Sequence, residues 1–225
     1  MRSTNSFSLI PPRLGARTPA AAFLHNRSML VLASASPRRR ELLTQAGYTF
    51  AVQPAHINED LRPEEDPSAY VTRLAREKAE VIFRELSASD SRQSDNCANS
   101  DPLCVLGADT TVTLDNHILA KPENQADAAR MLRLLSGRTH RVITGVALAT
   151  QAGTQVAAEV TAVRFNTLSD EEIAAYVATD EPMDKAGAYA IQGRAARWIP
   201  RIEGCYFNVV GLPLALVTHM LDSLK

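Results

Sequence analysis

Three consecutive arginines follow a serine-rich turn at the start of a predicted helix, and this arrangement is suited to binding phosphate. Residues 30–33 are apolar and are typical of a strand, Ser36 suits the N-cap position, and Pro37 suits the first helical position. Residues 38–40 are all arginine, and a cation in the first turn of an exposed helix costs about 0.3–1 kcal/mol. A bound polyanion would turn this free-energy cost into a gain, because backbone N–H groups and guanidinium groups would face negative oxygens. These residues alone leave two interpretations open, a phosphate-binding turn and a solvated basic helix start.

Two further charged residues stand inside apolar runs. Asp109 comes shortly after a predicted strand of residues 103–106, which we expect Gly107 to interrupt. An acid in such a run is costly unless it is paired or coordinated, so Asp109 is a candidate site residue; the alternative is a strand-end aspartate that accepts backbone N–H groups. Lys78 lies on the apolar face of a long predicted helix, residues 68–86. Its ammonium group must either extend to solvent or meet an anion, because burying it unpaired is costly.

Five sequence blocks occur in an order that resembles the Maf family of nucleoside triphosphate pyrophosphatases. They span residues 29–213 and consist of S-x-S-P-R-R-x-E-L-L after the first strand, LAREKA at 74–79, GADTTV at 107–112, KPEN at 121–124, and a run over 184–213 that contains DKAGAYAIQG and VVGLP. The resemblance implies an α/β fold similar to that of inosine triphosphatases. It also implies a mixed twisted sheet in two lobes around a central cleft, and a homodimer.

The resemblance further implies a reaction and the carboxylates that carry it. Asp109 would be the catalytic base that activates a water for attack at the α-phosphorus, releasing pyrophosphate and a nucleoside monophosphate. Glu59 and Asp109 would hold a divalent metal, Mg²⁺ or Mn²⁺. Glu59 stands in His-Ile-Asn-Glu, where many relatives have Asp-Ile-Asp-Glu, so His56 and Asn58 depart from the family pattern. The alternative for Glu59 is an ordinary loop acid.

The same resemblance assigns the residues that would bind the substrate. These are Ser34, Arg38, Arg39, Lys78, Thr110, Lys121 and Gln192. The family's specificity positions correspond to Arg38, Thr110 and Gln192. A glutamine amide has both a donor and an acceptor, so Gln192 is able to read the edge of a base. The Ile-Gln-Gly sequence around it is similar to the branch that acts on dTTP and UTP. Two alternatives stay open: a pyrophosphatase for modified purine nucleotides such as 7-methyl-GTP, and a nucleotide-binding regulator of cell division with little turnover.

The remaining chain is predicted to be scaffold. We expect a helix over 125–135, an antiparallel hairpin of 139–150 with 155–166, a short helix that a Ser169–Glu172 capping box begins, and a final helix over 214–224. Residues 29–225 are expected to form a single domain with a polar surface loop at 87–102. Residues 1–28 contain four arginines and no acidic residue, and are interpreted as an N-terminal extension: a targeting segment, a disordered tail or a mis-assigned start.

Bulk composition excludes several classes of partner. The formal net charge of −1 gives no general attraction to nucleic acid or to a membrane surface, so any anion site must be local. No apolar run reaches the roughly 18 residues that a membrane span needs. The three cysteines form no CxxC pair, which favours a reducing setting, and we expect a cytoplasmic protein. The sequence contains neither a Walker A nor a GxGxxG pattern.

Overall fold

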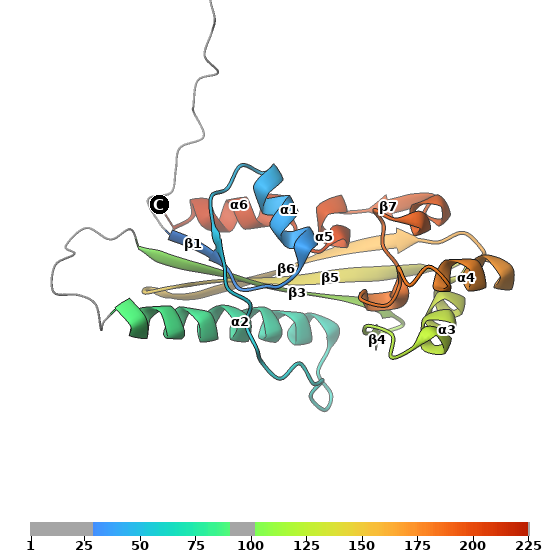
Figure 1. The fold of residues 1–225 in the computed structure, drawn as a ribbon, viewed down its shortest axis with the longest axis horizontal. Helices are drawn as coiled ribbons and strands as arrows, with labels where there is room; N and C mark the ends of the chain where they lie inside the picture. Colours follow the sequence, from blue (N-terminus) through green and yellow to red (C-terminus); the bar gives the residue numbers. More distant parts are fainter. Residues whose placement is uncertain (1–28, 91–101, 225) are drawn as a thin grey trace, which may run out of the picture.

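A mixed β-sheet forms the centre of the molecule (Figure 1). The computed structural model describes residues 29–90 and 102–224. In the order β2-β1-β3-β5-β6-β7, neighbouring strands are hydrogen-bonded, and β4 also pairs with β3. The strands are β1 (Met29–Leu32), β2 (Ala51–Val52), β3 (Leu103–Leu114), β4 (His117–Leu119), β5 (Thr139–Thr150), β6 (Gly153–Arg164) and β7 (Arg201–Glu203). β1 runs parallel to β2 and β3, whereas the other pairings are antiparallel.

Helices cover both faces of this sheet. The helix α2 lies along one face, and α1, α5 and α6 lie on the other, while α3 and α4 pack near the far end of the long strands (Figure 1). Their bounds are α1 (Pro37–Gln45), α2 (Pro67–Asp90), α3 (Gln125–Leu135), α4 (Asp170–Val177), α5 (Tyr206–Val210) and α6 (Leu214–Asp222), with short 3-10 helices η1 (Ala186–Ala188) and η2 (Arg194–Trp198). No helix in the described ranges is both long and apolar enough to cross a membrane.

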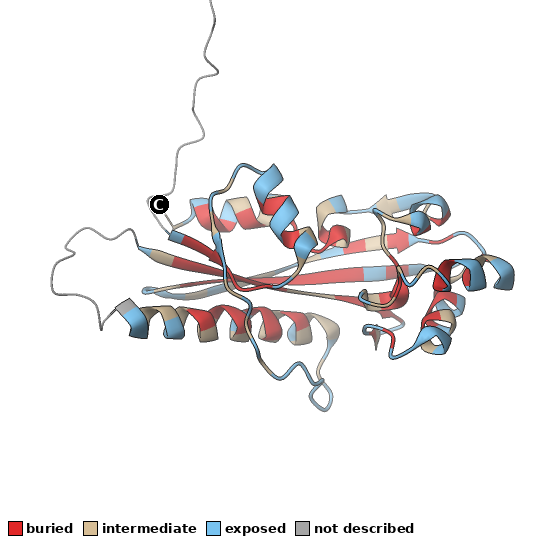
Figure 2. Cartoon of the chain, in the orientation of Figure 1, coloured by how far each residue is buried: buried red, intermediate tan, exposed pale blue. Residues whose placement is uncertain are grey.

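The core is divided between two lobes that share the long strands. One apolar cluster joins β1, α1 and α6 to the first half of β3 and the second half of β5, and a second fills the space under α2. A third joins α3, α4 and β4 to the other end of the same strands. Figure 2 shows the buried residues concentrated along the strands that connect these regions. The expected α/β class and mixed sheet are therefore confirmed.

A gap beside β3 sets the place of the functional site. On one edge of β3, β1 pairs with residues 103–106 and β4 pairs with residues 112–114, so residues 107–111 lie between these two partners. Successive side chains of a strand point to opposite faces. Asp109 accordingly faces α2, whereas Thr110 faces α1. Both side chains reach one space because no neighbouring strand separates the two faces at this gap.

The expectation that Gly107 interrupts the strand is wrong. β3 continues through Gly107 and is 12 residues long in total. A Cβ atom on Gly107 would lie 2.1 Å from the backbone oxygen of Ala75, and one on Gly145 of β5 would lie 2.3 Å from the backbone oxygen of Val71. The two glycines therefore serve close packing of α2 on the sheet, which holds Lys78 near Asp109.

Gly107→Ala should lower the free energy of unfolding by about 1–3 kcal/mol, the usual range for overpacking a core. The methyl group meets backbone atoms of α2, which cannot rotate away as a side chain could. Urea unfolding followed by circular dichroism measures this change. An unfolding midpoint equal to that of the wild type would contradict the close packing of α2 against β3.

Most other predicted elements occur as expected. Ser36 caps α1, Pro37 is its first residue, and Ser169 and Glu172 form the predicted capping box of α4. The predicted loop start at residue 87 is wrong, because α2 continues to Asp90. In this last turn Ser89 donates its hydroxyl hydrogen to the backbone oxygen of Glu85 (2.9 Å), which is compatible with an exposed helix end. The rest of that loop and the extension of residues 1–28 lie outside the described residues.

Candidate active site

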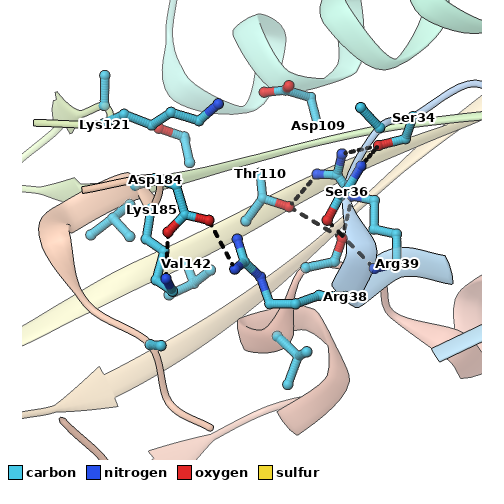
Figure 3. A pocket seen from close by; sticks show the side chains of 18 of the residues that line it. Ser34, Ser36, Arg38, Arg39, Asp109, Thr110, Lys121, Val142, Asp184 and Lys185 are labelled. Carbon is cyan, nitrogen blue, oxygen red and sulfur yellow. Dashed lines mark hydrogen bonds and ion pairs between the residues drawn. The ribbon is translucent and has the colours of Figure 1, made fainter. Parts of the chain in front are cut away.

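A cavity of about 620 Å³ opens at the gap beside β3 (Figure 3). This volume lies within the range of roughly 300–1,000 Å³ that small-molecule sites usually have. Every site residue predicted from the sequence lines this cavity: Ser34, Arg38, Arg39, Glu59, Lys78, Asp109, Thr110, Lys121 and Gln192. Residues from both lobes, distant in sequence, thus come together in one space.

Lys78 joins two carboxylates at one end of this cavity. Its Nζ lies 2.6 Å from Oε1 of Glu59 and 2.7 Å from Oδ1 of Asp109. Lys78 is only 7% exposed, so its ammonium group meets anions and does not extend to solvent. Burial by itself raises the pKa of Glu59, but the hydrogen bond and charge of Lys78 outweigh it, so this pKa lies below its ordinary value. Glu59 is consequently ionised at neutral pH.

Arg39 fixes the phosphate-binding turn predicted from the sequence. Its Nε donates to the backbone oxygen of Gly211 (2.8 Å), its Nη1 to Oγ of Ser34 (3.1 Å) and its Nη2 to Oγ1 of Thr110 (3.0 Å). Burial lowers the pKa of this guanidinium, and the charge of Asp109 opposes that shift. Three of the five N–H groups of a guanidinium are used in this way. Arg39 therefore ties β1, β3 and the α5–α6 turn together at the cavity wall.

Arg38 points across the cavity toward the other lobe. Its Nη1 lies 3.4 Å from Oδ2 of Asp184, and Asp184 also pairs with Lys185 (Figure 3). The Asp184 side chain is 66% exposed; the burial that remains tends to raise its pKa, but Lys185 and Arg38 outweigh this effect and lower the pKa overall. Lys121 lies on the same side of the cavity as Asp109 (Figure 3). Positive side chains thus surround the polar part of the cavity.

The remaining wall of the cavity is apolar. It includes Val112, Val142, Ile191, Val209 and Val210, and Gln192 directly follows Ile191 in the chain. An apolar wall with one adjacent amide can take a flat aromatic group and orient it through a few hydrogen bonds. The cavity as a whole therefore offers cations and carboxylates for a polyphosphate, together with an apolar wall for a base.

The sequence profile of the family described as Maf-like protein matches residues 29–224. The chain belongs to the Maf family. A relative from Koribacter versatilis is 51% identical over 192 residues, which covers 85% of this chain and 92% of the relative. Relatives from Moorella thermoacetica (50% over 196 residues, 86% and 94% covered) and Escherichia coli K12 (48% over 194 residues, 86% and 92% covered) are similar. All three are named dTTP/UTP pyrophosphatase.

The chain is also similar in part to a solved structure, a nucleoside-triphosphatase / dITP/XTP pyrophosphatase from Mycobacterium abscessus. It has a TM-score of 0.39 and 14% identity, and the match covers 62% of this Maf chain and 75% of that structure's chain.

Three cavity residues of this Maf protein were missed from the sequence. Asp184 and Lys185 stand at the start of the block that carries the family resemblance, and this adjacent charge pair was the available signal. The third is Tyr70, which donates its hydroxyl hydrogen to the backbone oxygen of Glu59 (2.9 Å). Burial, followed by the charges of Asp109 and Glu59, raises the pKa of Tyr70 to about 12, so it keeps this hydrogen at neutral pH. Tyr70 therefore holds the loop that carries Glu59.

The two carboxylates near Lys78 fit a magnesium-type site in which a bound substrate supplies some of the metal ligands. Oxygens of Glu59 and Asp109 converge on one Nζ atom, so they lie close together. Among the described residues, no group of three or more histidine, cysteine, aspartate or glutamate side chains could hold a metal ion. Mg²⁺ in nucleotide enzymes commonly binds one or two carboxylates, with phosphate oxygens and waters as further ligands. The two carboxylates fit this pattern.

Proposed function

We propose that this Maf protein hydrolyses dTTP and UTP to the nucleoside monophosphate and pyrophosphate. The observation that carries the proposal is the cavity itself, in which the Glu59–Lys78–Asp109 cluster and Lys121 lie beside an apolar wall that ends at Gln192. The names of relatives that are about half identical over most of their length support the same reaction and the same bases. The enzyme is thus a hydrolase of the bond between the α- and β-phosphates.

In this mechanism Asp109 accepts a proton from the water that attacks the α-phosphorus. A bond forms between the water oxygen and the α-phosphorus, and the bond from the α-phosphorus to the bridging oxygen breaks, so pyrophosphate leaves with the electron pair. Lys78 and Lys121 offset the negative charge that the triphosphate brings into the cavity. Catalysis of phosphoryl transfer consists mostly of positioning and charge stabilisation, which these residue types supply.

We also propose a divalent metal, Mg²⁺ or Mn²⁺, held by Glu59 and Asp109 together with phosphate oxygens. Such a metal supplies charge neutralisation and polarisation of the phosphoryl group. The role of Lys78 is then to hold the two carboxylates close together before the nucleotide arrives. Electron paramagnetic resonance measures the affinity for Mn²⁺ with and without a non-hydrolysable UTP analogue, and this measurement does not depend on turnover.

A panel of dTTP, UTP, CTP, 7-methyl-GTP and ITP tests the proposed substrates, with pyrophosphate and orthophosphate measured separately. We expect pyrophosphate from dTTP and UTP. Turnover of a purine nucleotide alone would favour the alternative pyrophosphatase for modified purines, and binding without product would favour a regulator. A homodimer and a cytoplasmic location remain predictions from the sequence, and size-exclusion chromatography with light scattering tests the dimer.

Gln192→Ala and Arg38→Ala should change base preference more than they lower the best rate. Each variant removes a group at the base side of the cavity and leaves Asp109 and Lys78 in place. We expect the ratio of kcat/KM for UTP to that for CTP to fall by about 10-fold or more, because hydrogen-bonded groups discriminate steeply between bases. The substrate panel measures this ratio. An equal loss for all nucleotides would instead make these side chains phosphate-binding or scaffold residues.

A further inference from the structure

Gln192 lies in a turn that two side chains outside the cavity hold on both sides. The backbone N–H of Ala190 donates to the hydroxyl oxygen of Tyr176 (3.2 Å), and the backbone N–H of Arg194 donates to Oε1 of Glu181 (3.1 Å). Within the turn, the N–H of Gly193 donates to the backbone oxygen of Ala190 (3.1 Å). The position of this turn therefore depends on Tyr176 and Glu181, and no strand within residues 29–90 or 102–224 pairs with it.

Tyr176 and Glu181 also fix each other. The hydroxyl group of Tyr176 donates to Oε1 of Glu181 (2.9 Å). Tyr176 is only 2% exposed and packs edge-on against Trp198, with ring centroids 5.1 Å apart. Burial and the hydrogen bond to Glu181 raise the pKa of Tyr176, so the phenol keeps its hydrogen at neutral pH. Lys185 donates to the backbone oxygen of Glu181 (2.6 Å), which connects this pair to the cavity wall.

Gly193 shows how closely the carboxylate approaches the turn. Its φ of −102° is open to any residue, so backbone conformation does not require glycine here. A Cβ atom at this position would lie 1.9 Å from Oε1 of Glu181 and 2.5 Å from its Cδ. The glycine that follows Gln192 therefore makes room for the Glu181 carboxylate, and the side chain and the turn fit together as one unit.

We infer that Tyr176 and Glu181 are positioning residues for base selection, acting through the turn that carries Gln192. This inference rests on the proposed function, in which the Gln192 amide faces the base. Hydrogen bonds weaken steeply with distance and angle, so an amide discriminates between bases only when its backbone is held in place. The chemical groups read in this way are the N3 and C4 substituents of a pyrimidine, which differ in donor and acceptor pattern between uracil and cytosine.

Glu181→Ala tests this inference through the ratio of kcat/KM for UTP to that for CTP. We expect the ratio to fall by about 10-fold or more, chiefly through a higher KM for UTP, because loss of the anchor leaves the amide unplaced. Glu181→Gln should keep the ratio within about threefold of the wild type, because its amide oxygen can still accept both hydrogen bonds. Tyr176→Phe keeps the ring and its packing, removes only the hydroxyl, and should also lower the ratio.

Glu172→Ala is the matched control. Glu172 accepts a hydrogen bond from Trp198 (3.1 Å) and belongs to the α4 capping box, so its loss weakens the same region without touching the turn. We expect the control to lower thermal stability and keep the base ratio. If Glu181→Ala and Tyr176→Phe lower kcat/KM equally for both nucleotides, the positioning role is overturned. A wild-type protein that releases no pyrophosphate from any nucleotide would overturn the proposed function, and this inference with it.

Discussion

Asp109→Asn should lower kcat by about 10²–10⁴ while the protein stays folded, as expected for the loss of a general base. The amide is nearly the same size as the carboxylate but cannot take up the proton of the attacking water. Lys78 still has Glu59 as a partner in this variant, so we expect little change in stability. Steady-state pyrophosphate release from UTP, together with the thermal unfolding midpoint, measures both effects.

The control for this substitution is Asp115→Asn, the same chemical change just beyond the end of β3. Asp115 is exposed and pairs with Arg138 outside the cavity (2.7 Å). It has a positive φ of 51°, a conformation that asparagine also adopts. We expect this control to turn over like the wild type. A folded Asp109→Asn variant with wild-type activity would remove Asp109 from the role of catalytic base.

Lys78→Met should lower kcat/KM by about 10²–10³, the usual effect of removing one charge-stabilising donor from a catalytic site. Methionine fills the same buried space between α2 and β3 but leaves two carboxylates facing each other. The triphosphate would then meet net negative charge at this end of the cavity. Arg84→Met on the exposed side of the same helix is the control, and we expect it to keep wild-type activity.

The same variant should change how stability depends on pH. The pKa of Glu59 is lowered in the folded protein, so this group contributes stability above its ordinary pKa of about 4.3. That contribution is lost as the pH falls from this value through the lower pKa of the folded state. Without Lys78 the pKa of Glu59 rises, so the loss of stability over this acidic range should become smaller. Unfolding curves at several pH values below 5 give the free energy of unfolding of both proteins. An equal dependence of this free energy on pH would contradict the coupling between Lys78 and Glu59.

Lys78 and Asp109 could be selected from the sequence as candidate site residues because each is unusual in its setting. Burying either Lys78 on an apolar helix face or Asp109 inside an apolar run is costly without a partner. The structure shows that the two form an ion pair, with Nζ of Lys78 2.7 Å from Oδ1 of Asp109. Neither hydropathy nor periodicity could predict that pairing, because it depends on how α2 is placed along β3. That placement in turn depends on Gly107, which the sequence suggested as a strand break and which instead permits close contact.

The cavity wall was harder to predict than the end of the cavity that holds Lys78. Asp109 and Thr110 are adjacent in sequence but face opposite sides of the sheet, and only the gap between β1 and β4 brings both into one cavity. Arg39 was predicted as a substrate ligand, and its three hydrogen bonds to protein atoms show an additional structural task. Two of these contacts join Arg39 to residues 71 and 172 positions further along the chain, and local sequence pattern does not encode such contacts.

Hydrolysis of UTP in ¹⁸O-enriched water tests the central claim most directly. If Asp109 directs water to the α-phosphorus, UMP should carry the label, pyrophosphate should be unlabelled, and one pyrophosphate should form for each UTP consumed. Mass spectrometry of both products, with Mg²⁺ and with Mn²⁺, measures this. Label in the pyrophosphate, or release of orthophosphate in its place, would contradict attack of water at the α-phosphorus in this cavity.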